Sequence, residues 1–373
     1  MAVWTGGRAR KRQATDDERY YLASQRELVW RKFRKHRLAL LSSGVLALLY
    51  LLAVFADFLA PYEVNARNTL YLNTPPQGVR LSLEGSPHLY VTGFERTNDP
   101  LTLAFVFKPD PNQRLPLEFF VRGHPYRLFG IFPTDRHLFG VADGPVFLFG
   151  TDALGRDIFS RTLHALRISL FVGLVGVALS FVLGVVLGGV SGYFGGPVDM
   201  VVQRLIEFLL AIPTIPLWMA LSAALPPEWS SVRVFFGITI ILSLIGWSGI
   251  ARVVRGKFLE LREQDFVTAA RIAGAGHGRI IFKHLAPSFS SYLIVQLTLL
   301  VPSMLLGETA LSFLGLGIQP PAVSLGTLLQ DAQNIRTVSL TPWLLIPAVF
   351  VIAIVLAFNF VGDGLRDAAD PYK

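Results

Sequence analysis

Long apolar runs separated by charged segments dominate this chain of 373 residues. A helix that crosses a bilayer needs about 20 mostly apolar residues, and six runs meet that length. The sequence therefore predicts an all-α polytopic membrane protein with six transmembrane helices. They are Leu38 to Ala60, the uncharged stretch between Arg167 and Asp199, a run from near Val201 to Pro227 kinked at Pro213 and Pro216, the stretch between Arg233 and Arg252, His284 to Gly307, and Thr337 to Gly362.

A polar segment of 89 residues, Pro61 to Phe149, separates the first two runs. Within it, residues 101–107 and 115–121 are rich in β-formers, and the intervening Lys108 to Arg114 has the composition of a turn. We predict a β-rich extracytoplasmic insertion that contains a hairpin at this place. The chain then divides into a basic tail (1–37), a first span (38–60), the insertion (61–149) and a core with five further spans (150–373).

The distribution of Lys and Arg predicts the orientation. Residues 1–37 hold eleven of them, and the loop at 251–288 is also basic, so the positive-inside rule places both in the cytoplasm. An even number of spans returns the C-terminus to the same side. Arg156, Arg161 and Arg167 are an exception, because they precede the second span on the predicted outside.

Composition narrows the possible functions. Hydrophobic residues make up 52% of the chain and charged residues only 16%, whereas soluble domains carry about a quarter of their residues as charges. The net charge of +8 lies at the ends of apolar runs, so it indicates membrane orientation and not nucleic-acid binding. There is no cysteine, no phosphate-binding loop, no His-Glu-x-x-His motif and no ligand-spaced cluster among the seven histidines. We predict no catalytic, cofactor or metal site in this chain.

The basic loop contains a helical elbow at residues 265–288. Phe266, Ala269, Ala270 and Ala273 recur at helical spacing, and Gly274 ends the helix. A second short helix is expected from near His277 to Leu285, ending before Pro287. A small apolar face of this kind suits a groove on a partner protein, although an ordinary amphipathic loop at the membrane surface has the same periodicity.

Two further features lie inside the spans. Gly184, Gly188 and Gly192 form a ladder of small residues that lets helices approach closely in lipid, within the chain or where two subunits meet. Glu308 lies at the end of the fifth run. Ionisable residues within membranes are functional candidates, so Glu308 is a candidate for the translocation path, with pairing to Arg336 or a helix start as alternatives.

A turn before the second span carries the other motif. It runs Gly150-Thr-Asp-Ala-Leu-Gly-Arg-Asp-Ile-Phe-Ser-Arg161, so that Asp157 is favourably placed near a helix N-terminus. This segment resembles the signature of permeases from the oligopeptide/dipeptide importer family, carried by Gly150, Thr151, Asp152, Gly155, Arg156 and Asp157. Gly307 to Gly317 and Asn359 to Asp367 are also similar to that family.

The elbow resembles the "EAA" loop of ABC-importer permeases. The matching loop residues are Thr268, Ala269, Ala270, Gly274, Ala275 and Pro287. Three positions depart from the family pattern: Thr268 replaces a glutamate, His284 an isoleucine and Ala286 a leucine. The resemblance implies type I ABC-importer permease architecture, with an elbow that docks onto an ATPase. A Gly274→Pro change, or a bulky residue at Ala269 or Ala270, is then expected to uncouple ATP hydrolysis from transport.

The resemblance also implies the setting of the protein. It predicts a multi-pass subunit of the cytoplasmic membrane with both termini inside, which pairs with a second permease, two ATPase subunits that bind ATP and Mg²⁺, and an extracytoplasmic solute-binding protein. Di- or oligopeptides are the expected cargo, with oligosaccharides or nickel as alternatives. An ion-coupled secondary transporter and a membrane scaffold are the alternatives from other classes; the spans show no mid-span charges of the kind such a transporter uses.

Overall fold

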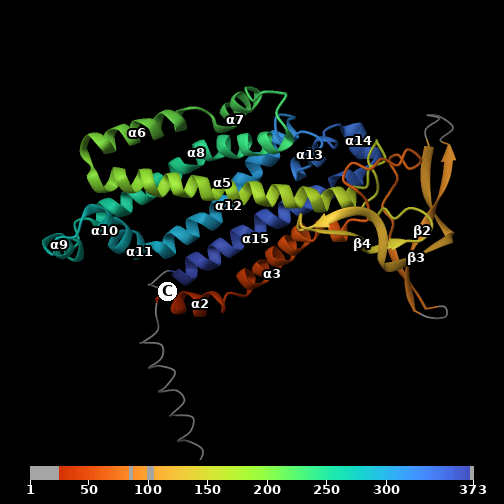
Figure 1. The fold of residues 1–373 in the computed structure, drawn as a ribbon, viewed down its shortest axis with the longest axis horizontal. Coiled ribbons are helices and arrows are strands. Elements are labelled where there is room, and N and C mark those ends of the chain that lie inside the picture. The colour runs from red at the N-terminus through yellow and green to blue at the C-terminus, as the bar shows by residue number, and fades with distance from the viewer. Residues whose placement is uncertain (1–24, 84–86, 99–104, 370–373) are drawn as a thin grey trace, which may run out of the picture.

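The computed structural model describes residues 25–83, 87–98 and 105–369. In this part of the chain, five helices are long and apolar enough to cross a membrane, or six if one bent pair counts as a span. The five are α3 (Arg37–Val54), α5 (Ile158–Phe194), α8 (Ser231–Leu261), α12 (Ser290–Phe313) and α15 (Ile346–Ala369). They form an elongated bundle with a β-sheet at one end and the elbow at the other (Figure 1).

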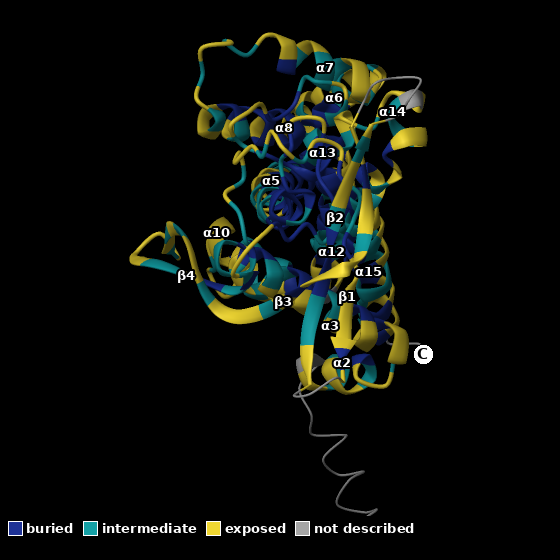
Figure 2. Cartoon of the chain, turned by 90° about the vertical axis from the view of Figure 1, so that its right-hand side faces the viewer, coloured by how far each residue is buried: buried dark blue, intermediate teal, exposed yellow. Residues whose placement is uncertain are grey.

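The core of the bundle surrounds α5. Leu166 and Leu170 on this helix are fully buried, and they belong to one cluster with Leu242 of α8, Leu305 of α12 and Ile354 of α15. Large apolar residues remain exposed on the outer faces of the helices (Figure 2). A helix satisfies its own backbone groups, so these faces are suited to lipid.

The glycine ladder of α5 lies against α8 of the same chain. A Cβ on Gly184 would come within 2.6 Å of the Ile250 side chain, and one on Gly192 within 2.6 Å of the Arg255 carbonyl oxygen. At Gly188 it would collide with the Ala251 backbone. The two helix backbones therefore touch along a seam that admits no side chain.

The third predicted span consists of two helices that form a sharply bent pair. The chain forms α6 (Gly196–Ala211) and α7 (Thr214–Ala223), which meet at an angle of 88°. Ile212, the residue between α6 and Pro213, has an extended backbone. The residue before a proline is disfavoured in the helical region. Pro213 therefore keeps Ile212 out of the helix, so that α6 ends at Ala211 and α7 begins at Thr214.

Shorter helices join the spans. The α2 helix (Gln25–Phe33) precedes α3, and α4 (Ala56–Leu59) continues it after a break at Phe55. Between α12 and α15 lie α13 (Leu325–Gln330), α14 (Ile335–Leu340) and a 3-10 turn (Pro342–Leu345). In Figure 1, α2 and the end of α15 lie on the elbow side of the bundle, opposite the sheet. Most of the predicted basic tail, residues 1–24, lies outside the described residues.

The insertion forms an antiparallel sheet of four strands in the order β1-β2-β3-β4. They are β1 (Val79–Ser82), β2 (His88–Asn98), β3 (Phe105–Leu128) and β4 (Phe132–Val141). The first half of the long β3 pairs with β2 and the second half with β4.

The predicted hairpin turn at Lys108–Arg114 is therefore wrong, because this segment lies within β3. Its prolines suggested a turn, but each half of β3 pairs on one side only, and an edge strand tolerates proline. Residues 101–104 of the expected first strand lie outside the described residues.

Candidate functional site

The elbow begins with α9 (Asp265–Ile272), which is held to the bundle by one face. Val267 is fully buried, whereas Thr268 and Ala269 are exposed and Ala270 is half-buried. The helix turns away at Gly274, whose φ of +79° lies in the left-handed region. The Gly274 N–H donates to the Arg271 carbonyl and the Ala275 N–H to the Ala270 carbonyl, both at 3.0 Å. These two bonds form the Schellman motif, which explains why the position is a glycine.

The second arm of the elbow is a continuous helical segment of changing pitch. It comprises α10 (His277–Arg279), a π-helical turn (Ile280–Leu285) and α11 (Ala286–Ser288). The prediction that this arm ends before Pro287 is wrong by about one turn. A proline ring clashes with the carbonyl four residues earlier in a regular α-helix, and the wider π-turn that precedes Pro287 gives the ring space.

The elbow packs against the ends of α5 and α8. Ile280 and Leu285 are buried in a cluster with Val254 and Phe258 of α8. At the end of α5, the Tyr193 hydroxyl and the Nδ1 atom of His277 lie 2.8 Å apart in a hydrogen bond. The sequence pattern gave no sign of this link, because the two residues are 84 positions apart. Both arms of the elbow are therefore fixed to the long helices.

The outward face of the elbow is apolar and basic. Three large apolar side chains point away from the bundle: Phe266 is 43% exposed, Ile272 84% and Phe282 71%. The basic residues Arg271, Arg279 and Lys283 are exposed on the same short segment. An exposed apolar patch rimmed by charges is typical of a protein–protein contact.

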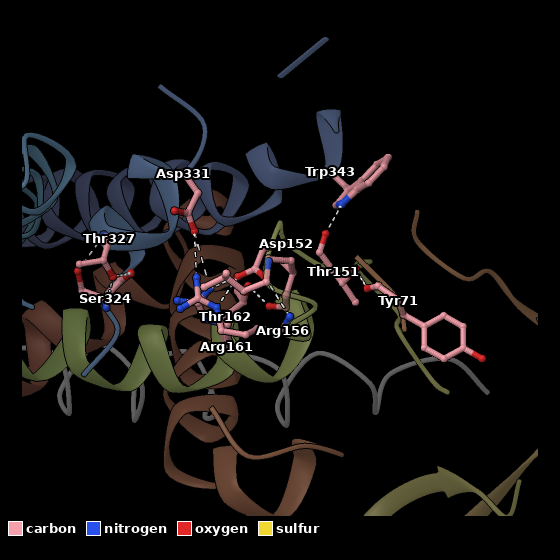
Figure 3. Close-up of polar contacts among 12 residues, drawn as sticks. Tyr71, Thr151, Asp152, Arg156, Arg161, Thr162, Ser324, Thr327, Asp331 and Trp343 are labelled. Atoms are coloured by element: carbon pink, nitrogen blue, oxygen red, sulfur yellow. Dashed lines mark hydrogen bonds and ion pairs between the residues drawn. The ribbon is translucent and has the colours of Figure 1, made fainter. Parts of the chain in front are cut away.

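The turn before α5 is a tightly hydrogen-bonded structure. Gly150 and Gly155 both have positive φ, +76° and +72°, and a Cβ on either would collide with backbone of the segment 68–74. The Thr151 hydroxyl donates to the Tyr71 carbonyl, and the Trp343 indole N–H donates to the Thr151 carbonyl (Figure 3). The turn thus joins the insertion to the segment that precedes α15.

Asp152 is the centre of a charged cluster in this turn. Its carboxylate accepts from Arg156 Nε at 2.6 Å and from Arg161 Nη1 at 2.5 Å. Asp331, at the end of α13, lies 3.6 Å from Arg156 and 3.7 Å from Arg161. Figure 3 shows both arginines between the two carboxylates. The sequence placed Asp152 and Arg156 in one motif but did not predict that Asp331 would join them.

The three arginines that disagreed with the positive-inside rule all have acidic partners. Arg156 and Arg161 pair with Asp152 and Asp331, and Arg167 Nη2 lies 2.8 Å from Asp57 Oδ2 at the end of the first span. All three arginines therefore form ion pairs that join the start of α5 to neighbouring segments of the chain.

Glu308 lies within α12 and not at a helix start. Its carboxylate accepts from the Ser312 hydroxyl at 2.7 Å and from the Ser169 hydroxyl of α5 at 3.1 Å, and the side chain is fully buried. The Leu325 N–H at the start of α13 donates to the same Ser169. The carboxylate therefore connects three elements. The side chain of Arg336, the alternative partner, lies outside the described residues.

One ion pair close to the elbow was not predicted. Asp199 of α6 accepts from Arg255 Nε at 2.5 Å and Nη2 at 2.6 Å, and also from the Ser191 hydroxyl. The bidentate geometry fixes α6 to α8 close to the elbow. Sequence alone offered no signal for it, since Asp199 only marked the end of an apolar run.

Comparison with known proteins assigns the family. A model described as "Binding-protein-dependent transport system inner membrane component" matches residues 184–372, which contain the elbow, the glycine ladder and Glu308. The chain belongs to this family. A second model, the "N-terminal TM domain of oligopeptide transport permease C", matches residues 24–76. The permease is thus a multi-pass membrane component of a transport system and not itself an enzyme, which confirms the resemblance and decides against the scaffold and the secondary transporter.

Curated relatives agree with the family. The permease is 34% identical over 344 residues to the dipeptide transport system permease protein DppC of Bacillus subtilis (strain 168). This alignment covers 92% of the permease and 84% of the relative. It is 43% identical over 224 residues to the oligopeptide transport system permease protein OppC of Haemophilus influenzae, covering 60% and 70%. Among solved structures, an inward-facing MetNI methionine ABC transporter aligns with a TM-score of 0.44 and 19% identity, covering 56% of the permease and 95% of that chain.

Proposed function

We propose that this permease is the membrane-spanning subunit of an ATP-driven, binding-protein-dependent importer of di- or oligopeptides. The names of its relatives, dipeptide and oligopeptide transport permeases, support this cargo class. In the proposed complex it pairs with a second permease, receives cargo from an extracytoplasmic binding protein and contacts two ATPase subunits that hold ATP and Mg²⁺. Both termini lie in the cytoplasm.

The observation that carries the proposal is the outward face of the elbow. Ile272 and Phe282 expose most of their apolar surface to solvent, which is unfavourable unless a partner covers it. The small exposed residues Thr268, Ala269 and Gly274 allow a partner's backbone to approach closely. The ATPase subunit is the proposed occupant, and Ala275 and Pro287 hold the two arms in the docking geometry.

The proposed mechanism is alternating access driven through the elbow. ATP-dependent closure of the ATPase dimer displaces the elbow, which is fixed to α5 and α8 by Tyr193–His277 and by the buried cluster around Phe258. The long helices then tilt as units between an inward- and an outward-facing packing. Glu308 is retained as a candidate for the path, as a carboxylate that leaves its serine partners in one of the two states.

A double substitution tests the docking surface. Ile272→Asp combined with Phe282→Asp removes two exposed anchors without disturbing the buried cluster. Each large apolar side chain contributes about 1.5–3 kcal/mol when buried, so ATPase binding is expected to weaken by about tenfold or more for each position. The measurements are co-purification of the ATPase subunit and ATP hydrolysis by the complex in nanodiscs.

Ile335→Asp serves as the matched control, because Ile335 is 87% exposed but belongs to α14, at the end of the bundle away from the elbow (Figure 1). It should leave ATPase binding unchanged. Full ATPase binding by the Ile272/Phe282 variant would exclude the elbow as the docking site.

The cargo is tested separately. The reconstituted complex is given its binding protein loaded with a peptide pool, an oligosaccharide pool or Ni²⁺, and ATP hydrolysis is measured. Stimulation by peptides alone is expected. Stimulation by oligosaccharides or nickel alone would keep the importer and overturn the peptide assignment.

A further inference from the structure

The tip of the β3–β4 hairpin combines exposed aromatic residues with an unusual backbone. Phe129 is 51% exposed, Ile131 72% and Phe132 62%. The tip turn contains Phe129 and Gly130 at φ +54° and +75°, and the Ile131 N–H donates to the Leu128 carbonyl at 3.1 Å. Asparagine and glycine are the residues that such positive-φ turn positions prefer. A bulky phenylalanine there is a conformational outlier, so neither burial nor turn geometry explains Phe129.

The hairpin runs alongside the end of the first span. The Phe120 and Phe58 rings lie 6.1 Å apart, and the Phe129 and Phe55 rings 5.5 Å apart in an edge-to-face contact. From Phe58 to Phe55 the chain runs toward the membrane, and from Phe120 to Phe129 it runs toward the hairpin tip. The two contacts therefore direct the tip toward the bilayer. Phe120 also has a positive φ, of +57°.

The length of α3 places the tip at a definite depth. Its 18 residues rise about 27 Å, close to the roughly 30 Å hydrocarbon core of a bilayer, and Arg34, Lys35 and Arg37 mark its inner end. Phe55, the residue after α3, therefore lies at the outer boundary of the hydrocarbon. Phe129, in contact with Phe55, lies at the same level.

Arg127, two residues before Phe129 in the chain, is exposed. With a rise of about 3.3 Å per residue, it lies about 7 Å farther from the bilayer centre than Phe129. That distance corresponds to the headgroup layer. Figure 2 shows the β4 end of the hairpin extending sideways beyond the helices. The exposed Leu48, Leu51 and Val54 of α3 continue the same apolar surface into the bilayer.

We propose that the β3–β4 hairpin is a lipid anchor, whose tip of Phe129, Ile131 and Phe132 inserts at the outer hydrocarbon boundary while Arg127 contacts lipid phosphates. Aromatic side chains are enriched at this level of membrane proteins. The anchor holds the insertion against the bilayer and keeps its base, at the start of α5, at a constant height. This role rests on the orientation given in the proposed function, but it is independent of the cargo and of the elbow.

The chain contains no cysteine, so a single introduced cysteine can be spin-labelled without removing any native thiol from this subunit. A nitroxide is attached at Ile131→Cys in the assembled complex, in nanodiscs of phosphatidylethanolamine and phosphatidylglycerol, and the parent complex gives the background label. Leu81→Cys on β1 is the matched control, because Leu81 is 59% exposed and equally aliphatic but far from the tip. Collision rates with oxygen and with a water-soluble nickel chelate are compared.

We expect label at Ile131 to favour oxygen over the chelate several-fold, and label at Leu81 to favour the chelate. Equal chelate access at the two positions would overturn the proposal. Shielding of Ile131 from both reagents would also overturn it, in favour of a protein partner such as the second permease.

The Phe129→Asn substitution separates anchoring from folding of the hairpin. Asparagine suits a positive φ better than phenylalanine does, so the turn is retained while one apolar anchor is lost. The oxygen preference of the Ile131 label should fall in this variant. An unchanged preference would mean that Phe129 does not contribute to a lipid anchor.

Discussion

The two carboxylate oxygens of Asp157, at the start of α5, have different environments. Its Oδ2 atom accepts the Ser160 N–H at 2.8 Å and caps the helix, whereas its Oδ1 atom is buried without a hydrogen-bond partner among the described residues. Burial raises the pKa of Asp157 to about 6, although the bonds from Ser160 and Phe159 act in the other direction. The sequence predicted the helix start correctly, but only packing reveals that one oxygen lacks a partner.

The raised pKa of Asp157 predicts a pH-dependent stability. In the unfolded chain the pKa is about 3.9, so the folded protein binds this proton more tightly. The resulting stabilisation is fully present below about pH 4 and is lost as the pH rises through about 6. At about 1.4 kcal/mol per pH unit the loss approaches 3 kcal/mol. Asp157→Asn should flatten the unfolding temperature of the purified permease between pH 4 and 7, because asparagine caps as well as aspartate does.

The exposed Asp143 provides the comparison for this experiment. Asp143→Asn should follow the pH dependence of the unsubstituted protein. If Asp157→Asn follows it too, the carboxyl of Asp157 is not the group that titrates.

At the scale of elements, the apolar runs located the membrane helices because a span needs only uninterrupted hydrophobicity. Breaks were harder to predict, since they depend on what surrounds the chain. Pro213 produced a bend of 88° where a kink was expected, and Pro287 was accommodated within a helical arm by a π-turn. The prolines of β3 indicated a turn. The sequence alone does not show that each half of this strand pairs on one side only, which is what allows it to contain prolines.

The seam between α5 and α8 predicts opposite outcomes for two glycines. Gly188→Ala places a Cβ against the Ala251 backbone and should separate the helices, lowering the unfolding temperature. Gly249→Ala on α8 meets no atom within 4 Å and should be neutral or stabilising by up to about 1 kcal/mol, because alanine favours the helix. Thermal unfolding of the two purified variants checks this. Equal effects would show that close backbone approach does not stabilise the seam.

At the scale of the whole molecule, the apolar pattern and the basic segments predicted a polytopic bundle with an insertion at one end and an elbow at the other. The site was predicted less completely. Spacing identified the residues of the elbow and of the Gly150–Asp157 turn, because those features are local. The partners Asp331, Asp57 and His277 come from distant segments, and one sequence contains no signal that brings them together.

The orientation of the bundle is a prediction at this scale. Lys35 and Leu83 are both exposed and lie at opposite ends of the molecule. In cells whose cytoplasmic membrane is intact, a membrane-impermeant maleimide should label Leu83→Cys but not Lys35→Cys. Disruption of that membrane should expose both. Labelling of Lys35→Cys alone in intact cells would invert the proposed topology.

The length of α5 has a mechanical consequence. Its 37 residues extend about 55 Å, nearly twice the roughly 30 Å hydrocarbon core. Arg161 and Arg167 form ion pairs near its first turns, and Tyr193 links its other end to the elbow. If α5 moves as a rigid rod, a tilt of about 10° around its midpoint moves each end by about 5 Å. A small push at the elbow would thus reach the opposite face of the membrane at full amplitude, without any helix having to bend.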